Sequence, residues 1–197
     1  GTIGLITYMR TDSVRISKEA QVSASEFISK EYGKDYVPLS PKIYKSKKNI
    51  QDAHEALRPT YIELIHSNIK SSLKDDQYKL YNLIWSRFVA SQMANCVLNT
   101  LSIEIKNGDY SFRASGSNIK FEGFMKIYKY TMQEEEESEK IPKLIAGDVL
   151  KSESIDGKQH FTQPPARFTE ASLVKTLEEN GIGRPSTYAP IISTLID

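Results

Sequence analysis

The sequence predicts a multidomain chain of α and β structure: a mainly α-helical part, then an antiparallel β-rich part, then a short α-helical segment at the C-terminus. A helical apolar pattern runs from Asp75 to about Asn95, apolar and polar residues alternate around Asn107-Gly108, and two helical patterns follow Pro164-Pro165. We therefore expect three domains, over residues 1–97, 98–165 and 166–197.

The composition of the 197 residues, with 39% hydrophobic and 26% charged residues, is that of a globular protein. No apolar run approaches the roughly 20 residues that a membrane-spanning helix needs. The first residues do not resemble a signal peptide, and Cys96 is the only cysteine, which excludes a disulfide and a cysteine-based zinc site within the chain. We expect a cytoplasmic protein without membrane contact.

The first domain is predicted to begin with a short strand over Ile3–Tyr8 and to continue with a helix capped by Ser17. Gly33 is suited to end that helix. Its apolar residues recur at helical spacing: Ala20, Ala24, Phe27 and Ile28. Residues 34–50 are rich in Pro, Ser, Lys and Tyr and are predicted to form a loop.

A long helix from Asp75 to about Asn95 is predicted to follow. Asp75 and Asp76 lie at its start, where negative charge suits the helix dipole. Its apolar side chains follow the i, i+3, i+4, i+7 rule: Tyr78, Tyr81, Ile84, Trp85, Phe88 and Val89.

The second domain is predicted to start with a hairpin that turns at Asn107-Gly108, since both residues tolerate positive φ. Residues 116–118 predict another turn, after which Ile119 and Phe121 begin a third strand, and residues 149–155 predict one more. The acidic residues 134–139 indicate a mobile insertion.

The third domain is predicted to hold two helices. Thr169 caps the first and Gly181 ends it, while Ser186 or Thr187 caps the second. The second helical pattern is interrupted at Asp197, as in a truncated chain.

Tyr8 and Arg10 form the first candidate functional group. Their spacing of two places both side chains on one face of an extended backbone. Arg10 could favour the phenolate of Tyr8 and bind a phosphate with two N–H groups, which suits phosphoryl transfer. The alternative is a half-buried tyrosine beside a surface arginine.

His54, flanked by acids and followed by Arg58, is a second candidate, as a phosphate ligand or proton shuttle. A zinc-peptidase motif is excluded because position 58 holds Arg where that motif needs a second His. The alternative is a surface helix end stopped by Pro59.

Residues 181–188 (GIGRPSTY) form a third candidate, because a turn before a helix N-terminus offers free N–H groups to a phosphate. The alternative is an ordinary corner between two helices.

Three long segments resemble type IA DNA topoisomerases of bacteria, in that family's order. Residues 4–13 (GLITYMRTDS) resemble its active-site tyrosine segment, residues 51–60 (QDAHEALRPT) its histidine segment, and residues 168–188 its DNA-binding stretch. Further likeness covers residues 83–92 (LIWSRFVASQ) and 119–124 (IKFEGF).

The resemblance implies roles for individual residues. Tyr8 would attack DNA and become linked to a 5′ phosphate, Arg10 would neutralise the scissile phosphate, and His54 would assist from a neighbouring helix. Thr11 and Asp12 would shape the pocket. The remaining residues implied to contact DNA are Arg58, Arg184, Ser186 and Thr187.

The resemblance also implies a larger enzyme that passes one DNA strand through another and relaxes negative supercoils. Its partner would be the single-stranded segments of negatively supercoiled DNA, in the bacterial nucleoid. That family binds Mg²⁺ through an Asp-x-Asp-x-Glu cluster of its Toprim domain, which does not occur here, so the Mg²⁺ site is expected outside this chain and no metal ligand is assigned within it. Residues 98–165 would form only the second half of the family's β-rich hinge (arch) domain.

The isolated chain is expected to be inactive, because it lacks the metal-binding acids. Its truncated edges are expected either to be covered in a crystal dimer or to be mobile. The main alternative is a non-catalytic DNA-binding module with a C-terminal helix–turn–helix, although the last helix has a core pattern rather than a base-reading one. A tyrosine-rich adaptor without catalysis is a second alternative. A covalent protein–DNA adduct would separate both from a topoisomerase.

Overall fold

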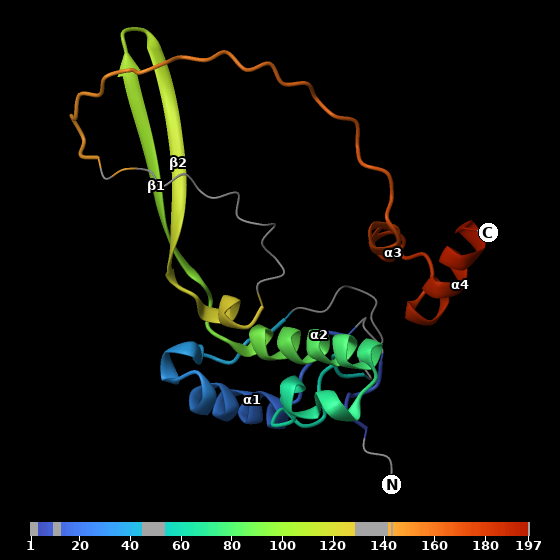
Figure 1. Ribbon diagram of the computed structural model, residues 1–197. Coiled ribbons are helices and arrows are strands. Elements are labelled where there is room, and N and C mark those ends of the chain that lie inside the picture. Colours follow the sequence, from blue (N-terminus) through green and yellow to red (C-terminus); the bar gives the residue numbers. More distant parts are fainter. Residues whose placement is uncertain (1–3, 10–12, 45–53, 129–141, 143, 197) are drawn as a thin grey trace. The chain divides into compact units, whose positions relative to one another are not determined.

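The computed structural model describes residues 4–9, 13–44, 54–128, 142 and 144–196. The chain divides into two compact units, Gly1–Pro142 and Lys143–Asp197. The described part of the first unit holds helices α1 (Lys18–Glu31) and α2 (Asp75–Gln92) and a hairpin of β1 (Val97–Asn107) and β2 (Tyr110–Phe121) (Figure 1). Helical and antiparallel β structure are thus both present, as predicted.

Helix α1 forms as the sequence predicts. The Ser17 hydroxyl accepts from the Ala20 N–H at 3.3 Å and caps the first turn. The predicted apolar face of the helix is buried, with Ile28 fully enclosed. Gly33 follows with a φ of 99°, a backbone conformation that favours glycine, and the short 3-10 helix η1 (Lys34–Tyr36) comes next.

Helices α1 and α2 together supply most of the core of the first unit. Trp85 is 1% exposed, its indole N–H donates to the Ile62 carbonyl at 2.9 Å, and Phe27 of α1 meets its ring edge-on at 5.8 Å between centroids. Helix α2 begins at Asp75 as predicted but ends at Gln92, because Met93 turns to an extended backbone and is itself buried in the core. Tyr78 lies half-buried beside His66 of the 3-10 helix η2 (His66–Ser72).

The predicted hairpin turn at Asn107-Gly108 is confirmed, with Asn107 paired with Tyr110 and Gly108 at a φ of 59°. The predicted turn at residues 116–118 is wrong. Gly116 pairs with Leu101 and Asn118 with Asn99, so Ile119 and Phe121 continue β2 instead of starting a third strand. A partner strand satisfies the backbone of these residues, and this outweighs their preference for turns.

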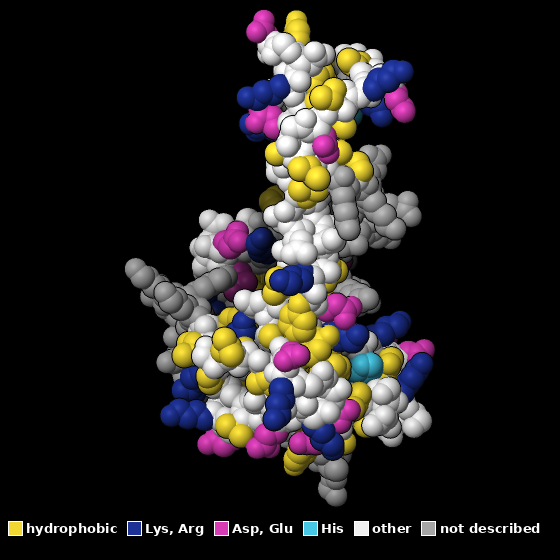
Figure 2. Space-filling view, turned by 90° about the vertical axis from the view of Figure 1, so that its left-hand side faces the viewer, with side chains coloured by type: hydrophobic (Ala, Val, Ile, Leu, Met, Phe, Trp, Pro, Cys, Tyr) yellow, Lys and Arg dark blue, Asp and Glu magenta, His cyan; other side chains and the backbone are white. Residues whose placement is uncertain are grey.

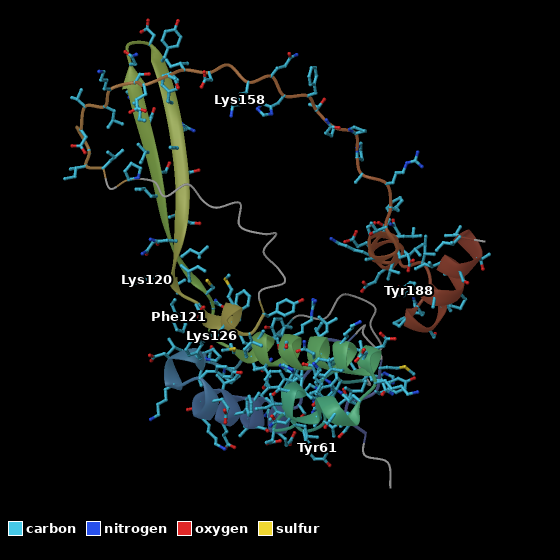
Figure 3. All side chains as sticks on the ribbon, in the orientation of Figure 1. Tyr61, Lys120, Phe121, Lys126, Lys158 and Tyr188 are labelled. Atoms are coloured by element: carbon cyan, nitrogen blue, oxygen red, sulfur yellow. The ribbon has the colours of Figure 1, made fainter. Side chains whose placement is uncertain are left out.

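The hairpin is joined to the helical body at its base. The Phe121 ring lies 4.8 Å from that of Tyr36 (Figure 3). Gly123, in the 3-10 helix η3 (Gly123–Lys126), has a φ of 50°, and a Cβ there would collide with the backbone of Asn95. Beyond this base, both faces of the ribbon are largely exposed, and Figure 2 shows hydrophobic side chains along it. The exposed large hydrophobic residues of β1 and β2 include Leu98, Leu101, Phe112 and Ile119.

The second unit holds helices α3 (Glu170–Glu179) and α4 (Pro185–Ile196). Thr169 caps α3 as predicted, its hydroxyl accepting from the Ser172 N–H. The strand predicted over residues 149–155 is not formed, since no other strand of this unit's described part is available to pair with it. Helix α4 begins at Pro185, before the predicted caps, because proline at the first helical position lacks only an N–H that would be unpaired anyway.

Within the described ranges, no helix combines the length and apolar character that crossing a membrane requires.

Candidate functional site

The tyrosine segment (residues 4–9) does not form the regular strand predicted over Ile3–Tyr8, and the chain bends at Thr7. In its described residues only Ile6 forms a β-bridge, which pairs it with Pro59 in antiparallel fashion. Two backbone hydrogen bonds flank this bridge, from the Thr7 N–H to the Arg58 carbonyl at 2.9 Å and from the Thr60 N–H to the Leu5 carbonyl at 3.0 Å. The segment before Tyr8 is therefore attached directly to the second predicted motif.

The histidine segment (residues 54–60) is not helical, so the prediction that His54 acts from a neighbouring helix is wrong. Pro59 disfavours helical backbone at the residue before it. The backbone N–H groups of the segment are also bound elsewhere: Ala56 donates to the Arg15 carbonyl at 2.7 Å, and Arg58 donates to the Thr7 hydroxyl at 3.0 Å. Long-range contacts thus replace the hydrogen bonds that a helix would have made.

The hydroxyls of two residues on either side of Tyr8 bind the backbone of the histidine segment. Before Tyr8, the Thr7 hydroxyl contacts the Ala56 carbonyl at 3.1 Å. After it, Ser13, which is 4% exposed, donates to the His54 carbonyl at 2.6 Å. Thr7 and Ser13, on either side of Tyr8 in the sequence, are therefore both attached to the segment that carries His54.

Tyr8 and His54 lie together although 46 positions separate them in the sequence. Their rings stack with centroids 5.3 Å apart and planes at 26°. Tyr8 is 63% exposed, so its phenol is open to a ligand from solvent. His54 is half-buried, and its Nδ1 is enclosed with no hydrogen-bond partner in the described parts of the chain. Arg10, Thr11 and Asp12 lie outside the described residues.

Glu55 and Arg58 form a partly buried ion pair beside this stack, with Oε2 and Nη2 2.9 Å apart. The other carboxylate oxygen of Glu55 accepts from the Ser17 N–H at 2.8 Å. Burial acts to raise the pKa of the Glu55 carboxyl, but the hydrogen bonds and charge of Arg58 and the bond from Ser17 outweigh it and lower that pKa. Glu55 is thereby held ionised.

The third predicted group lies in the second unit. Thr187 lies in the first turn of α4, and its hydroxyl accepts from the N–H of Arg184, the residue just before the helix, at 2.8 Å. Arg184 and Ser186 are exposed, and one guanidinium N–H of Arg184 reaches only the adjacent Gly183 carbonyl, at 2.7 Å. Gly183 has a φ of 75° and the ring of Tyr188 lies against it, which shapes a tight turn before the helix (Figure 3).

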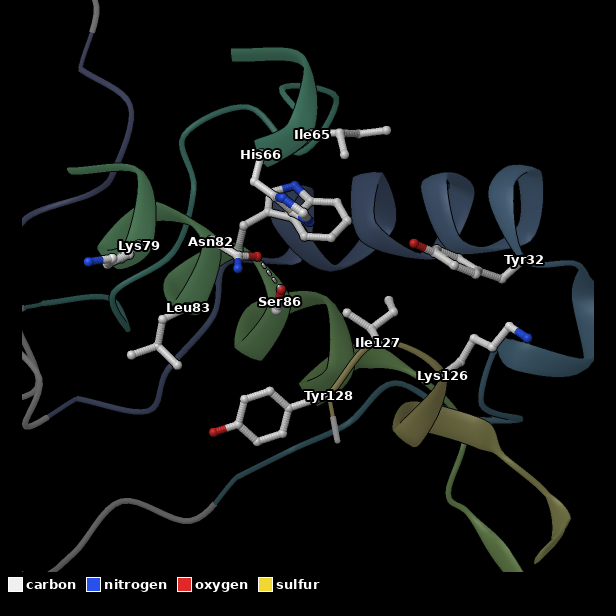
Figure 4. Close-up of a pocket in the computed structure, with 11 residues that line it drawn as sticks. Tyr32, Ile65, His66, Lys79, Asn82, Leu83, Ser86, Lys126, Ile127 and Tyr128 are labelled. Atoms are coloured by element: carbon white, nitrogen blue, oxygen red, sulfur yellow. Dashed lines mark hydrogen bonds between the residues drawn. The ribbon is translucent and has the colours of Figure 1, made fainter. Parts of the chain in front are cut away.

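A cavity of about 650 Å³ opens elsewhere in the first unit, between α2, η2 and η3 (Figure 4). Its wall includes Tyr32, His66, Asn82 and Lys126, and none of its lining residues belongs to the tyrosine or histidine segment. Burial lowers the pKa of the His66 imidazole there. Sequence reasoning did not identify this cavity, because no motif marks it.

No three His, Cys, Asp or Glu side chains come close enough to hold a metal ion in the ranges 4–9, 13–44, 54–128, 142 and 144–196. The described residues therefore do not fit a Mg²⁺ site, and the Mg²⁺ site predicted outside this chain stays a prediction.

Sequence reasoning assigned no role to Thr7, Ser13 or Glu55, although the structure places all three at the contact between the two segments. The sequence carries only a weak signal for their roles. Thr7 and Ser13 are hydroxyl residues that flank Tyr8, and Glu55 precedes Arg58 by three positions. Only the folded chain shows that these groups meet.

Comparison with known proteins agrees with this arrangement of motifs. Residues 2–197 match the family model described as DNA topoisomerase. The chain is 51% identical over 201 residues to DNA topoisomerase 1 of Rickettsia bellii, a match that covers the whole chain and 25% of that protein. The full-length topoisomerase I of Thermotoga maritima is similar in structure, with a TM-score of 0.71 at 33% identity over 98% of this chain and 30% of that one.

The chain thus spans about a quarter of the length of its curated relative, and the likeness runs through all three predicted motifs. It belongs to the bacterial type IA DNA topoisomerase family.

Proposed function

We propose that this chain supplies the nucleophile of a type IA DNA topoisomerase, and that Tyr8 is that nucleophile. The observation that carries the proposal is the stack of an exposed phenol on His54, formed by two motifs far apart in the sequence. An exposed phenol whose neighbours Thr7 and Ser13 are fixed by hydrogen bonds suits attack on a large substrate. Positioning of this kind can supply much of the catalysis in a phosphoryl transfer.

In the proposed reaction the Tyr8 phenol oxygen attacks the phosphorus of one DNA strand. A bond forms between that oxygen and the 5′ phosphate, and the bond from phosphorus to the 3′ oxygen of the preceding nucleotide breaks. The phenol loses its proton and the departing 3′ oxygen gains one. Because one phosphate ester replaces another, the 3′ hydroxyl can reverse the step after strand passage, and negative supercoils relax without ATP.

Arg10 is proposed to neutralise the scissile phosphate, and Thr11 and Asp12 to shape the pocket around it. His54 is proposed to assist the proton or phosphate chemistry, because its ring lies against that of Tyr8. Developing charge on a phosphate is best stabilised by donors that are already in position.

Arg184, Ser186 and Thr187 are proposed to hold the backbone of the single-stranded DNA. The guanidinium of Arg184 supports this, because it is exposed before the first turn of α4 and one of its N–H groups reaches only the adjacent Gly183 carbonyl. Arg58 is left out of this group because Glu55 and the Pro59 carbonyl already bind its guanidinium.

Mg²⁺ is proposed to act in the full-length enzyme from a site outside this chain. Bound there, it would supply positive charge to the DNA phosphates. No step of the reaction written above is assigned to a metal ligand of this chain.

The decisive test is Tyr8→Phe in the full-length enzyme, with negatively supercoiled DNA as substrate. We expect relaxation and the covalent protein–DNA adduct to disappear while DNA binding stays within about twofold, because only the attacking oxygen is removed. Tyr61→Phe is the matched control, since Tyr61 is also an exposed tyrosine, at 53% (Figure 3). A normal adduct from Tyr8→Phe would overturn the proposal, and DNA binding without any adduct from the unaltered enzyme would favour a non-catalytic DNA-binding module.

A further inference from the structure

We propose that Glu55 and Arg58 form a positioning pair that keeps His54 in place beside Tyr8, and that Arg58 does not itself contact DNA. This inference rests on the proposed function, because it concerns how the cleavage site is held together. It replaces the DNA-binding role that the family resemblance implied for Arg58.

The Glu55 carboxylate connects two parts of the chain. Oε1 accepts from the backbone N–H of Ser17, the N-cap residue of α1, at 2.8 Å. Oε2 accepts from Nη2 of Arg58 at 2.9 Å. One side chain therefore ties the histidine segment to the start of a helix whose inner face is part of the core.

The guanidinium of Arg58 is directed inward. Its Nη1 donates to the Pro59 carbonyl at 3.1 Å, its Nη2 is bound by Glu55, and its Nε is enclosed by protein. The side chain is only 16% exposed. An arginine that binds a backbone phosphate presents two N–H groups to it, whereas Arg58 has its Nε enclosed and little of its side chain open to solvent.

The pair acts on His54 through the chain itself. His54 directly precedes Glu55, and the hydroxyl of Ser13, which follows Tyr8 in the sequence, fixes the His54 carbonyl. A partly buried ion pair adds little net stability, because the loss of hydration offsets much of the attraction. Its main effect here is on geometry, where a displacement of about 1 Å can slow a reaction roughly 100-fold.

The test uses the full-length enzyme with Glu55→Gln, Arg58→Gln and the double variant. Two quantities are measured with a single-stranded oligonucleotide: the rate of covalent adduct formation under enzyme excess, and the Kd at several salt concentrations. We expect each single variant to form adduct roughly 10- to 100-fold more slowly, with the Kd and its salt slope unchanged. The double variant is expected to be no slower than the slower single one, because the two side chains act as a unit.

Glu122→Gln is the matched control. Glu122 forms an ion pair of similar length with Lys126, at 3.0 Å, at the base of the hairpin. Removing it alters an ion pair that does not touch the tyrosine or histidine segment, so the adduct should form at the unaltered rate.

A weaker Kd for Arg58→Gln, with a salt slope lowered by about one, would overturn the inference whatever the adduct rate of Glu55→Gln. Arg58 would then be a DNA ligand. Unaltered adduct rates in both single variants would contradict it equally.

If a single variant loses its fold, as judged from its Tm, Glu55→Gln with Arg58→Met removes both charges together and leaves no unpaired charge in the interior. Slow adduct formation at an unaltered Tm supports the inference. A normal rate, or loss of folding again, contradicts it, since the pair would then be dispensable for cleavage or simply structural.

Tyr8→Phe in the same adduct assay separates this inference from the proposed function. An adduct that persists in Tyr8→Phe contradicts the proposed function. An adduct that is lost in Tyr8→Phe but forms normally in the Glu55 and Arg58 variants contradicts only the positioning role.

Discussion

At the scale of single residues, Ser13 shows how much of the site depends on one buried hydroxyl. It donates to the His54 carbonyl at 2.6 Å and accepts from the Arg15 N–H at 3.3 Å. Water cannot replace these bonds easily, because the side chain is 4% exposed. Ser13 thus attaches the chain that follows Tyr8 to the histidine segment.

Ser13→Ala is expected to leave two backbone groups unpaired, at a stability loss of about 1–3 kcal/mol, and to slow adduct formation because the His54 carbonyl is no longer fixed. The measurements are the Tm and the adduct rate of the full-length enzyme. Ser67→Ala, at an exposed serine of η2, is the control. An unchanged Tm and rate for Ser13→Ala would show that other contacts hold the histidine segment.

Arg184 is a residue of a different kind, because its guanidinium is exposed at the start of a helix. Contact with backbone phosphates carries no sequence information. Arg184→Ala should therefore weaken single-strand binding similarly for all sequences and lower the salt slope by about one. Binding titrations with several oligonucleotides and salt concentrations test this, and Lys79→Ala serves as the surface-charge control. A loss confined to some sequences would indicate base recognition instead.

At the scale of elements, the junction between α2 and the hairpin depends on a close backbone approach. The Phe124 N–H donates to the Ala94 carbonyl at 2.9 Å, which draws η3 against the end of α2. Gly123 lies at this contact with positive φ and with the Asn95 backbone directly against it. A side chain at position 123 would push the two elements apart.

Gly123→Ala should destabilise the first unit by more than the roughly 1–2 kcal/mol that left-handed backbone alone costs a non-glycine residue. Gly108→Ala separates the cost of the left-handed backbone from the cost of the collision, because Gly108 has a similar φ of 59° but no atom within 4 Å of an added Cβ. The free energies of unfolding of both variants are compared in urea. Equal losses would mean that the collision at Gly123 relaxes without effect.

At the scale of the whole molecule, the described residues hold the proposed nucleophile Tyr8 and its neighbour His54 but no cluster of acids that could bind a metal ion. The curated relative is about four times as long, since this chain covers 25% of it. The departing 3′ oxygen also needs a proton or other stabilisation. Metal binding and stabilisation of the departing 3′ oxygen are therefore expected from the rest of the enzyme.

The isolated 197-residue chain is therefore expected neither to relax supercoiled DNA with Mg²⁺ nor to form a covalent adduct. Gel electrophoresis of the DNA and of the denatured protein–DNA mixture measures the two activities. Relaxation or an adduct that disappears with Tyr8→Phe would show that the residues of this chain suffice for DNA cleavage.

The predicted dimer through the hairpin, whose exposed residues include Leu98 and Phe112, stays a prediction that sedimentation of the same sample can test.

The sequence by itself determined the elements whose causes are local. Ser17 and Thr169 cap helices, the apolar spacing of α2 selects its buried face, and Asn107-Gly108 turns the hairpin, because each effect acts within a few residues. The motifs also placed the chain in its family. The prediction failed where a turn preference competed with strand pairing, as at Gly116, and where a strand had no partner, as at residues 149–155.

Only the tertiary structure decided how the candidate site is assembled. The histidine segment is not helical, and two of its N–H groups bind Arg15 and Thr7, residues about 40 to 50 positions away; no local pattern can predict such partners. The same holds for the inward guanidinium of Arg58, which a motif alone presents as a free DNA ligand. The residue types at the site were readable from the sequence, whereas their hydrogen-bond partners were set by contacts between distant segments.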